Sequence, residues 1–303
     1  MPECGVTRLD HEQILSIEEI YRIASILTDM GIRRIRLTGG EPLVRRGIDD
    51  LLGQLGSLPD KPAIALTTNG LLLEDKIDML KSAGVKDVNI SLDTRDAEVF
   101  KRLTGTDALD KVERSIKRAV EEGLKVKLNS VILKGLNDDG IEQIVTYAKD
   151  YDIDVRFIEL MPIGPGADYE GVTGDEILNR LELSFGKATL VTDSLGIING
   201  PARYVHFAGF KGNVGFIDPM THAFCSRCNR IRLTVDGMLK LCLYYEDGLD
   251  LKAMLRSGCT DEEIGDAIAA TVLGKPKEHE FNRNCIDTDN EKKDRRDMFQ
   301  IGG

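Results

Sequence analysis

Three cysteines in the last third of the chain have the spacing of a metal or cluster site. Cys225 and Cys228 are separated by two residues, and Cys242 follows after thirteen more. A structural zinc site needs four ligands, and His222 is the nearest candidate for a fourth. Three thiolates on a [4Fe–4S] cluster would instead leave one iron open for a substrate. The spacing therefore favours an iron–sulfur cluster, with zinc and a non-metal role as alternatives.

Two arginines lie directly between those cysteines. Arg230 and Arg232 alternate in the segment NRIRLT, so both side chains would point the same way on a strand. A pair of guanidinium groups beside a cluster would suit a phosphate group. The alternative is a solvated strand face, which is common and carries little energy.

A glycine-rich turn follows an expected strand in the first part of the chain. In Thr38-Gly39-Gly40-Glu41-Pro42, the glycines let backbone approach a ligand, and Glu41 could accept from an ammonium group. The segment is neither a Walker loop nor a dinucleotide fingerprint. Taken alone, it is better explained as a plain strand-to-helix turn.

Composition limits the classes of partner. The 303 residues carry a formal net charge of −11, which disfavours a general nucleic-acid or membrane-surface binder. An anion would need a local group of Arg and Lys. The sequence has no run of about 20 apolar residues and no signal-peptide pattern at its start. We therefore expect a cytoplasmic protein with reduced thiols, no membrane partner and no nucleic acid.

The first half of the chain alternates helical and strand patterns. Ser16 and Glu19 have the spacing of a capping box, which opens an amphipathic helix ending near Gly31. Further helices are expected from residue 48 and over 74–83, 111–122 and 140–149, and strands over 34–38, 63–68, 87–92, 125–133 and 153–160. This repeated order predicts parallel strands in a barrel or a doubly wound sheet.

The expected strands alternate apolar and polar residues, whereas parallel strands covered on both faces are usually apolar throughout. Val88 and Ile90, for example, alternate with Asn89 and Ser91. One face can pack on helices, and the polar face predicts a barrel lumen that is wet or filled by a ligand. The alternative, an open antiparallel sheet with one solvated face, fits the intervening helices less well.

The pattern changes after about residue 185. Short β segments at 188–191, 203–207 and 214–217 are separated by glycine-containing turns, and a second capping box begins at Thr260. We therefore predict a boundary near this point, dividing the chain into 1–185 and 186–303.

Six motifs, in chain order, resemble those of the GTP 3′,8-cyclase family, radical S-adenosylmethionine (SAM) enzymes that make the first pterin intermediate of molybdenum-cofactor biosynthesis. They lie at 38–42, 67–70, 91–93, 127–129, 156–161 and 225–242. The stretch DPMTHAFCSRCNRIRLT at 218–234 and the closing Gly302-Gly303 are the most specific. The resemblance covers residues 1–303.

The resemblance implies an α/β fold, with an incomplete (β/α)6 radical-SAM-type barrel and a smaller C-terminal α+β subdomain that carries the cluster. It also implies site residues. The residues that would contact SAM are Gly40, Ser91, Arg156 and Met161. Those that would contact GTP are Arg36, Thr67, Lys127, Arg230 and Arg232, with Arg34 as a basic neighbour. The ligands of a [4Fe–4S] cluster would be Cys225, Cys228 and Cys242. The Gly302-Gly303 tail would reach into the active site.

The implied reaction is a lyase reaction, the SAM-dependent cyclisation of GTP to (8S)-3′,8-cyclo-7,8-dihydroguanosine 5′-triphosphate. In the family, a first barrel strand and a CxxxCxxC loop precede the segment that here begins Met1-Pro2-Glu3. The loop binds the radical-generating [4Fe–4S] cluster, so we assign no catalytic residue in this chain. We expect either a start site placed too late or a shortened protein that binds a cluster and GTP without turnover; the charged lumen favours the first.

The same resemblance leads us to expect turnover only from a version extended upstream. A flavodoxin- or ferredoxin-type protein would supply electrons, and a homodimer is compatible with the sequence. Another radical SAM enzyme with an auxiliary cluster is the remaining alternative, which the two RIRLT arginines and the terminal Gly-Gly disfavour.

Overall fold

The computed structural model describes residues 9–192, 200–281, 293–294 and 296–301. The chain forms two compact units. The first unit contains Thr67–Ile77 and Asp87–Cys228, and the second contains the described parts of Pro2–Leu66, Asp78–Lys86 and Asn229–Gly303. The predicted Gly302-Gly303 contact lies outside the described residues.

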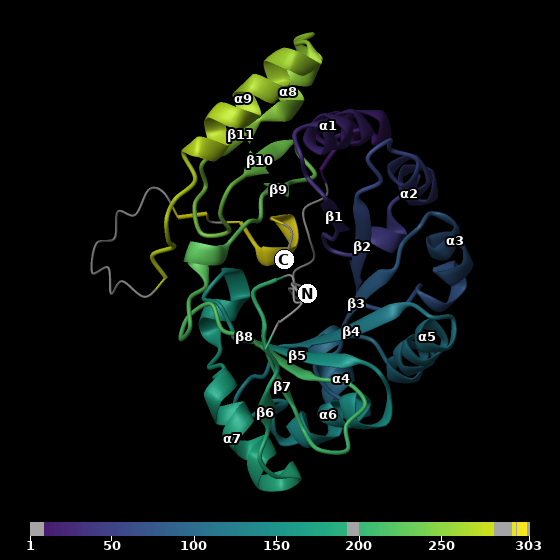
Figure 1. Cartoon of the computed structure of the whole chain (residues 1–303), viewed down its shortest axis with the longest axis vertical. Helices are drawn as coiled ribbons and strands as arrows, with labels where there is room; N and C mark the ends of the chain where they lie inside the picture. The colour runs from purple at the N-terminus through teal and green to yellow at the C-terminus, as the bar shows by residue number, and fades with distance from the viewer. Residues whose placement is uncertain (1–8, 193–199, 282–292, 295, 302–303) are drawn as a thin grey trace. The chain divides into compact units, whose positions relative to one another are not determined.

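The first unit is built on a mainly parallel sheet (Figure 1). Its central strands run parallel, and two antiparallel strands extend one edge. In spatial order the strands are β3 (Asp87–Ser91), β4 (Lys125–Ser130), β5 (Asp154–Ile158), β8 (Val214–Ile217), β7 (Arg203–His206) and β6 (Thr189–Leu190). The helices are α4 (Ala97–Thr104), α5 (Leu109–Glu121), α6 (Ile141–Asp150) and α7 (Gly174–Phe185).

Alternation along these strands separates two environments. The apolar positions form the core beneath the helices, since Val88, Leu128 and Val155 are all fully buried. The polar positions lie on the opposite face, because successive side chains of a strand point to opposite sides. Asn89 and Arg156 on that face are also buried, at 4% and 8% exposure. The polar face is therefore enclosed at Asn89 and Arg156, whereas Ser91, at the end of β3, is exposed. The parallel pairing rules out the open antiparallel sheet for β3, β4, β5 and β8.

The second unit joins the two ends of the chain. It contains α1 (Ile17–Asp29), β1 (Arg34–Leu37), α2 (Ile48–Gly56), most of β2 (Ala63–Thr68) and α3 (Ile77–Ser82), and a three-stranded antiparallel sheet of β9 (Arg232–Leu233), β10 (Met238–Lys240) and β11 (Gly248–Asp250). Helices α8 (Leu251–Arg256) and α9 (Asp261–Leu273) follow, and the 3-10 turn η7 spans Met298–Gln300. Strands β1 and β2 pair in parallel.

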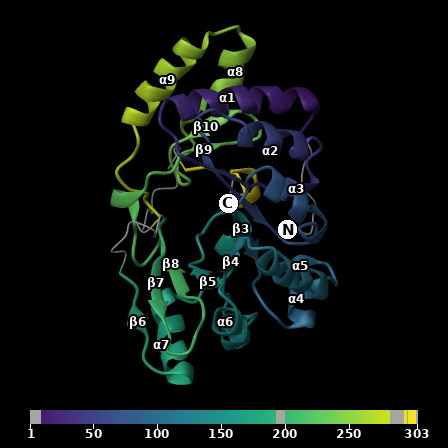
Figure 2. The same ribbon diagram turned by 45° about the vertical axis from the view of Figure 1, so that its right-hand side comes forward.

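Helix α1 packs on α8 and α9 although more than 200 residues separate them (Figure 2). They share one apolar cluster with β10, formed by Leu15, Ile23, Ile26, Leu239, Leu251, Leu255, Ile264 and Ile268. Two ion pairs border this cluster: Arg22 Nε lies 2.7 Å from Asp261, and Arg256 Nε lies 2.8 Å from Glu19. The second unit is thus a single core made from distant parts of the sequence.

Most sequence predictions of local structure are confirmed. The Ser16 hydroxyl accepts from the Glu19 amide at 3.1 Å while the Glu19 carboxylate accepts from the Ser16 amide at 2.7 Å, the reciprocal capping box expected there. The strand expected through the arginines at 230 and 232 is shorter, because β9 contains only Arg232 and Leu233. Strands β7 and β8 follow residue 185 and belong to the first unit's sheet. The domain boundary near residue 185 stays a prediction.

Two glycines offer matched tests of packing. An added Cβ at Gly212 would lie 2.0 Å from the Ile153 carbonyl oxygen, whereas one at Gly53, within α2, would meet nothing within 4 Å. We expect Gly212→Ala to lower the free energy of unfolding by about 1–3 kcal/mol through overpacking. Gly53→Ala should raise it by up to about 1 kcal/mol through helix propensity. Urea unfolding followed by circular dichroism checks both, and an unchanged midpoint for Gly212→Ala would refute the packing argument.

Candidate functional site

Two rows of polar side chains cross the first unit's sheet. Strand register places Asn89 opposite Lys127 in one row. In the next row, Ser91 lies opposite Asn129, and Asn129 lies opposite Arg156. The rows exist because each strand presents every second residue to the same face. They gather Ser91, Lys127 and Arg156, three of the predicted site residues, on one face of one sheet.

Arg156 is the most deeply placed cation of these rows. Its Nη2 donates to the Asn129 side-chain oxygen at 2.6 Å. Its Nε is buried and has no hydrogen-bond partner among the described residues, and the same holds for the Asn89 side-chain oxygen. A buried polar atom left without a partner costs about 1–3 kcal/mol. These two atoms lie on β3 and β5, on either side of β4. Unpartnered polar atoms on one face of a sheet are those expected of a site that a polar ligand completes.

Lys127 is also shielded, with 12% of its side chain exposed. Burial lowers the pKa of its ammonium group to about 8, and the nearby charge of Arg156 acts in the same direction. The Asp87 carboxylate, 3.9 Å from Nζ, opposes the shift of this pKa. Asp154, opposite Lys127 on β5, opposes it as well. Because the pKa is lowered despite both carboxylates, an anionic ligand would stabilise the charged form of this lysine further.

The structure adds two side chains that the sequence prediction did not assign. Asn89 donates through Nδ2 to the Thr67 hydroxyl at 3.4 Å, and Asn129 holds the Arg156 guanidinium. Both occupy polar positions of alternating strands, and Asn129 also ends the motif at 127–129, so these two signals could have identified them. Gly215, opposite Arg156 on β8, leaves room for that arginine, because an added Cβ would lie 3.0 Å from Arg156 Cγ.

The remaining predicted residues of the glycine-rich turn and β1 belong to the second unit. Arg36 lies on β1 opposite Ala65, and Arg34, on the same strand, is exposed. Gly39 adopts a φ of 134°, which favours glycine, and an added Cβ at Gly40 would meet nothing within 4 Å. The Glu41 carboxylate accepts from the Leu43 amide at 3.1 Å and so caps the turn Pro42–Val44. Open backbone at Gly40 is compatible with the predicted ligand contact.

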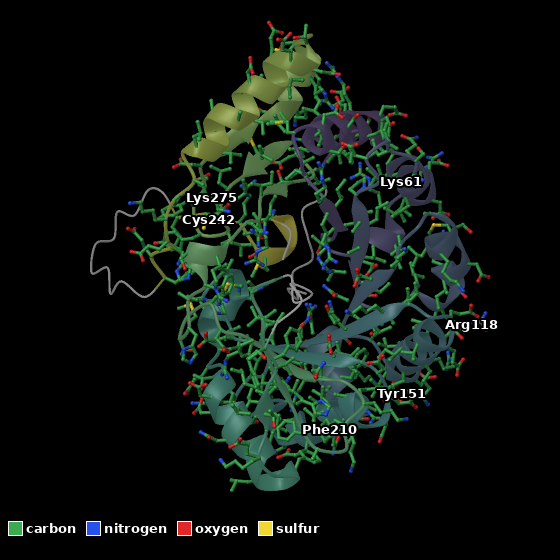
Figure 3. The ribbon with its side chains drawn as sticks, in the orientation of Figure 1. Lys61, Arg118, Tyr151, Phe210, Cys242 and Lys275 are labelled. Atoms are coloured by element: carbon green, nitrogen blue, oxygen red, sulfur yellow. The ribbon has the colours of Figure 1, made fainter. Side chains whose placement is uncertain are left out.

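The three predicted cluster cysteines are half-buried and form no disulfide among the described residues. Cys225 begins the 3-10 turn η6 (Cys225–Arg227), and the Cys228 amide donates to the Cys225 carbonyl at 3.1 Å. Cys242 follows β10 in the second unit, and Figure 3 labels it there. Within either unit, the described residues bring together no three His, Cys, Asp and Glu side chains able to hold a metal ion. The donor chemistry suits an iron–sulfur cluster, and its assembly stays a prediction.

The predicted phosphate-binding arginines also lie in the second unit. Arg232 is half-buried and pairs in register with Lys240, whereas Arg230 is exposed outside the strand. The Arg230 carbonyl accepts from Lys275 Nζ at 2.6 Å, which holds its backbone. The two side chains therefore do not share a regular strand face.

A carboxylate network in the first unit fixes the loop that leads to Cys225. Glu159, just after β5, accepts from the amides of Met220 and Thr221 at 2.7 and 2.9 Å. Asp175 accepts from Arg203 at 2.6 Å and contacts His222 Nε2 at 2.8 Å. These bonds, the His222 contact first, lower the pKa of Asp175. His222 is thus already engaged, which weakens its case as a fourth zinc ligand.

Met161 and Asp93 complete the predicted motifs of this unit. Met161 is half-buried and lies beyond the end of β5. Asp93 follows β3, and its carboxylate accepts from the Val131 amide at 2.8 Å. Burial raises the pKa of Asp93 to about 6.

None of the helices in the described part of the chain has the length and the apolar character needed to span a membrane.

Comparison with family models covers most of the chain. The Radical SAM superfamily matches residues 4–148, and Molybdenum Cofactor Synthesis C matches residues 153–281. The solved structure of SuiB from Streptococcus suis aligns with a TM-score of 0.57 over 81% of this chain and 56% of SuiB, at 18% identity. That likeness concerns the fold alone. With the family match, it confirms the predicted α/β radical-SAM-type partial barrel.

Curated relatives align over almost the whole chain. The GTP 3′,8-cyclase of Clostridium perfringens strain 13 is 42% identical over 97% of this chain and 89% of its own length. The GTP 3′,8-cyclase of Syntrophomonas wolfei is 41% identical over 100% of this chain and 92% of its own. That of Thermodesulfovibrio yellowstonii is 44% identical over 91% and 86%.

The carboxyl of Asp93 allows a test of burial by pH. Its pKa of about 6 lies above the unfolded value of 3.8, so its stabilising contribution is complete below pH 4 and is lost as the pH rises through 6. Asp93→Asn keeps an acceptor for Val131 and cannot titrate. The free energy of unfolding of the native chain, relative to this variant, should fall by about 1–3 kcal/mol between pH 4 and pH 7. A constant difference across that range would show that Asp93 is not desolvated.

Proposed function

This chain belongs to the GTP 3′,8-cyclase family of radical SAM enzymes, and from that premise we propose how its residues serve the cyclisation of GTP that begins molybdenum-cofactor biosynthesis. The observation that carries the proposal is the buried cationic row of the first unit. Arg156 and Lys127 stand on one enclosed face of β4 and β5, with the Nε of Arg156 lacking a partner among the described residues. A buried cation with an incomplete set of partners costs folding free energy, and a bound anion would offset that cost.

The proposed SAM site consists of Gly40, Ser91, Arg156 and Met161. Arg156 can only donate hydrogen bonds, and a guanidinium matches a carboxylate in shape and charge. Asn129 fixes its orientation from one side at 2.6 Å, which leaves Nε for a ligand oxygen. Open space at Gly40 would admit a ligand close to the backbone. When bound, SAM and a reduced [4Fe–4S] cluster supply a 5′-deoxyadenosyl radical.

The proposed GTP site consists of Arg36, Thr67, Lys127, Arg230 and Arg232. These residues offer up to four positive charges to the triphosphate within a chain of net charge −11. Lys127 is the residue whose surroundings support this role most directly, because burial weakens its hydration before the substrate arrives. Its share in the reaction is to hold and orient the nucleotide and to offset the phosphate charge in a site shielded from water.

The proposed second cluster site consists of Cys225, Cys228 and Cys242. Three thiolates leave one of the four irons of a [4Fe–4S] cluster without a protein ligand, which is the position that the guanine base would take. The turn η6 and the Glu159 network support the first two thiols. A flavodoxin- or ferredoxin-type electron donor and a cytoplasmic location belong to the same proposal.

The reaction itself can be tested with protein that retains any coding sequence preceding Met1 in frame. After anaerobic reconstitution with iron and sulfide, incubation with GTP, SAM and dithionite should produce 3′,8-cyclo-GTP and 5′-deoxyadenosine, detected by mass spectrometry. Cys242→Ser should bind about four irons fewer per chain than the unmutated protein. Zinc in place of iron at these cysteines, or 5′-deoxyadenosine without the cyclic nucleotide, would contradict the proposal.

Lys127 allows a separate test by pH. Because its pKa is about 8 in the free protein, GTP affinity should weaken as the pH rises from 7 to 9 and the ammonium loses its proton. Lys127→Arg should bind GTP with little change over that range. Lys127→Met should weaken binding roughly 10- to 100-fold at pH 7, the value of one charged hydrogen bond. Isothermal titration without reductant measures all three.

The matched control is Lys117→Met, which removes an exposed lysine from α5. Its GTP affinity should stay within about twofold of the unmutated value, because exposed charges contribute little. Equal losses from Lys117→Met and Lys127→Met would show a general effect of charge and would remove Lys127 from the site.

A further inference from the structure

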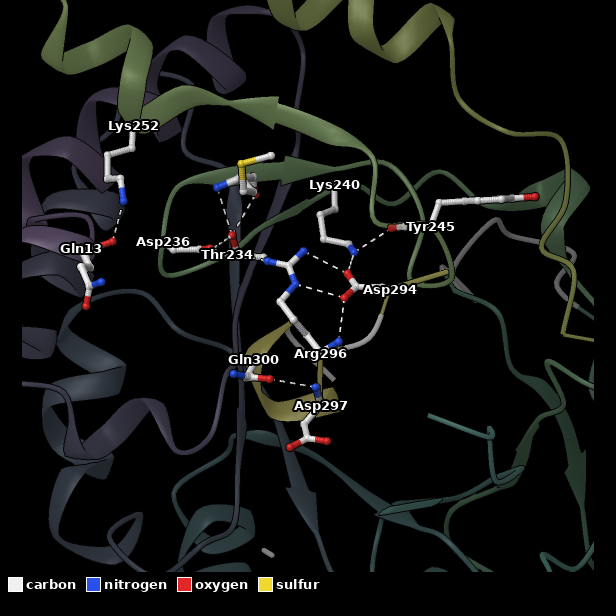
Figure 4. Close-up of polar contacts among 11 residues, drawn as sticks. Gln13, Thr234, Asp236, Lys240, Tyr245, Lys252, Asp294, Arg296, Asp297 and Gln300 are labelled. Carbon is white, nitrogen blue, oxygen red and sulfur yellow. Dashed lines mark hydrogen bonds and ion pairs between the residues drawn. The ribbon is translucent and has the colours of Figure 1, made fainter. Parts of the chain in front are cut away.

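A buried group of charges lies at the end of β10, away from the rows described above. Lys240 is fully buried, and the Asp294 side chain is 2% exposed. The Lys240 ammonium contacts the Asp294 carboxylate and donates to the Tyr245 carbonyl at 2.7 Å (Figure 4). Lysine is almost never fully buried without a partner. The position of this pair therefore calls for an explanation.

Arg296 completes the group. Its Nη2 lies 2.9 Å from Asp294 Oδ2, and its Nε lies 3.1 Å from Oδ1. Its Nη1 also lies 3.5 Å from Asp236, in the turn between β9 and β10. Two cations and two carboxylates are thus balanced in charge. We call Lys240, Asp294 and Arg296 the clamp.

The clamp contacts both ends of the segment that contains Cys242, residues 240–245. Lys240 begins this segment, and its ammonium reaches forward to the carbonyl of Tyr245, so one side chain closes the loop 240–245. The Asp294 amide donates to the Tyr244 carbonyl at 2.8 Å, and Tyr245 forms a β-bridge with Lys293. The C-terminal segment therefore holds this loop through both backbone and side chain.

Stability alone does not account for the clamp. A buried ion pair recovers little more than the cost of removing its charges from water, and apolar residues of similar size often serve as well. An apolar residue at position 240 could not donate to the Tyr245 carbonyl. What the charged residues add is a fixed conformation for loop 240–245.

We propose that Lys240, Asp294 and Arg296 are positioning residues for Cys242, and that the described C-terminal residues 293–294 and 296–301 are thereby a structural part of the second cluster site. The proposal rests on the proposed function, in which Cys242 is a cluster ligand. Arg232 pairs in register with Lys240, so the same clamp also fixes the strand that carries this proposed GTP contact. Ile301, close to the end of the described chain, is fully buried.

The test is the double variant Lys240→Met/Asp294→Asn, which removes both charges together and leaves no buried charge unpaired. Its urea midpoint should stay close to that of the unmutated protein. It should nevertheless bind about four irons fewer per chain after anaerobic reconstitution. Without iron, hydrogen exchange in the peptide covering 240–246 should be at least tenfold faster, because the bond to the Tyr245 carbonyl is gone.

Two comparisons make the result specific. Arg22→Gln breaks an exposed ion pair of the same unit and should change neither iron content nor exchange in 240–246. Arg296→Gln removes the clamp's more exposed member and should give intermediate changes in both. This milder variant also serves if the double variant fails to fold.

The outcomes separate the clamp from the function on which it rests. If Cys242→Ser retains full iron, the proposed cluster ligand fails, whatever the clamp does. If Cys242→Ser loses iron but the double variant and Arg296→Gln keep full iron and an unchanged electron paramagnetic resonance spectrum, the clamp proposal is overturned. Rapid exchange of 240–246 in the unmutated apoprotein would overturn it as well.

Discussion

Charge held away from water is the constraint on which this structure depends. Arg156 and Lys127 lie on the enclosed face of parallel strands, where each charge is costly unless a partner or a ligand offsets it. Asn129 and Asp87 offset part of that cost through one hydrogen bond and one distant carboxylate. A bound anion would offset the remainder, which is consistent with the binding role that we propose for Arg156 and Lys127.

The parallel sheet tolerates these buried charges because its two faces differ, one packing against helices and the other carrying the polar side chains. Val88, Leu128 and Val155 are fully buried on the helix side and contribute the hydrophobic free energy of the first unit. Their polar neighbours on the same strands face the other side of the sheet. The register between β4 and β5 then places Asn129 opposite Arg156, where it can accept a hydrogen bond from the guanidinium group.

The second unit meets the same constraint in a different way. Its buried charges are matched inside the protein, with Lys240 and Arg296 both at Asp294. Its apolar core joins α1 to α8 and α9, so residues from both ends of the chain share one cluster. Under our proposals, the cations of the second unit fix its backbone, whereas those of the first unit bind a ligand. The two units illustrate both uses of a buried charge.

The sequence by itself determined the local structure, the polar face of the strands and the family motifs. These follow from periodicity, capping residues and spacing, all of which are local properties. Only the tertiary structure decided the partners of the charges. Asp294 meets Lys240 across 54 residues, and Glu159 reaches the amides of Met220 and Thr221 across about 60. No local pattern encodes such pairs, because they depend on how distant strands and loops are brought together.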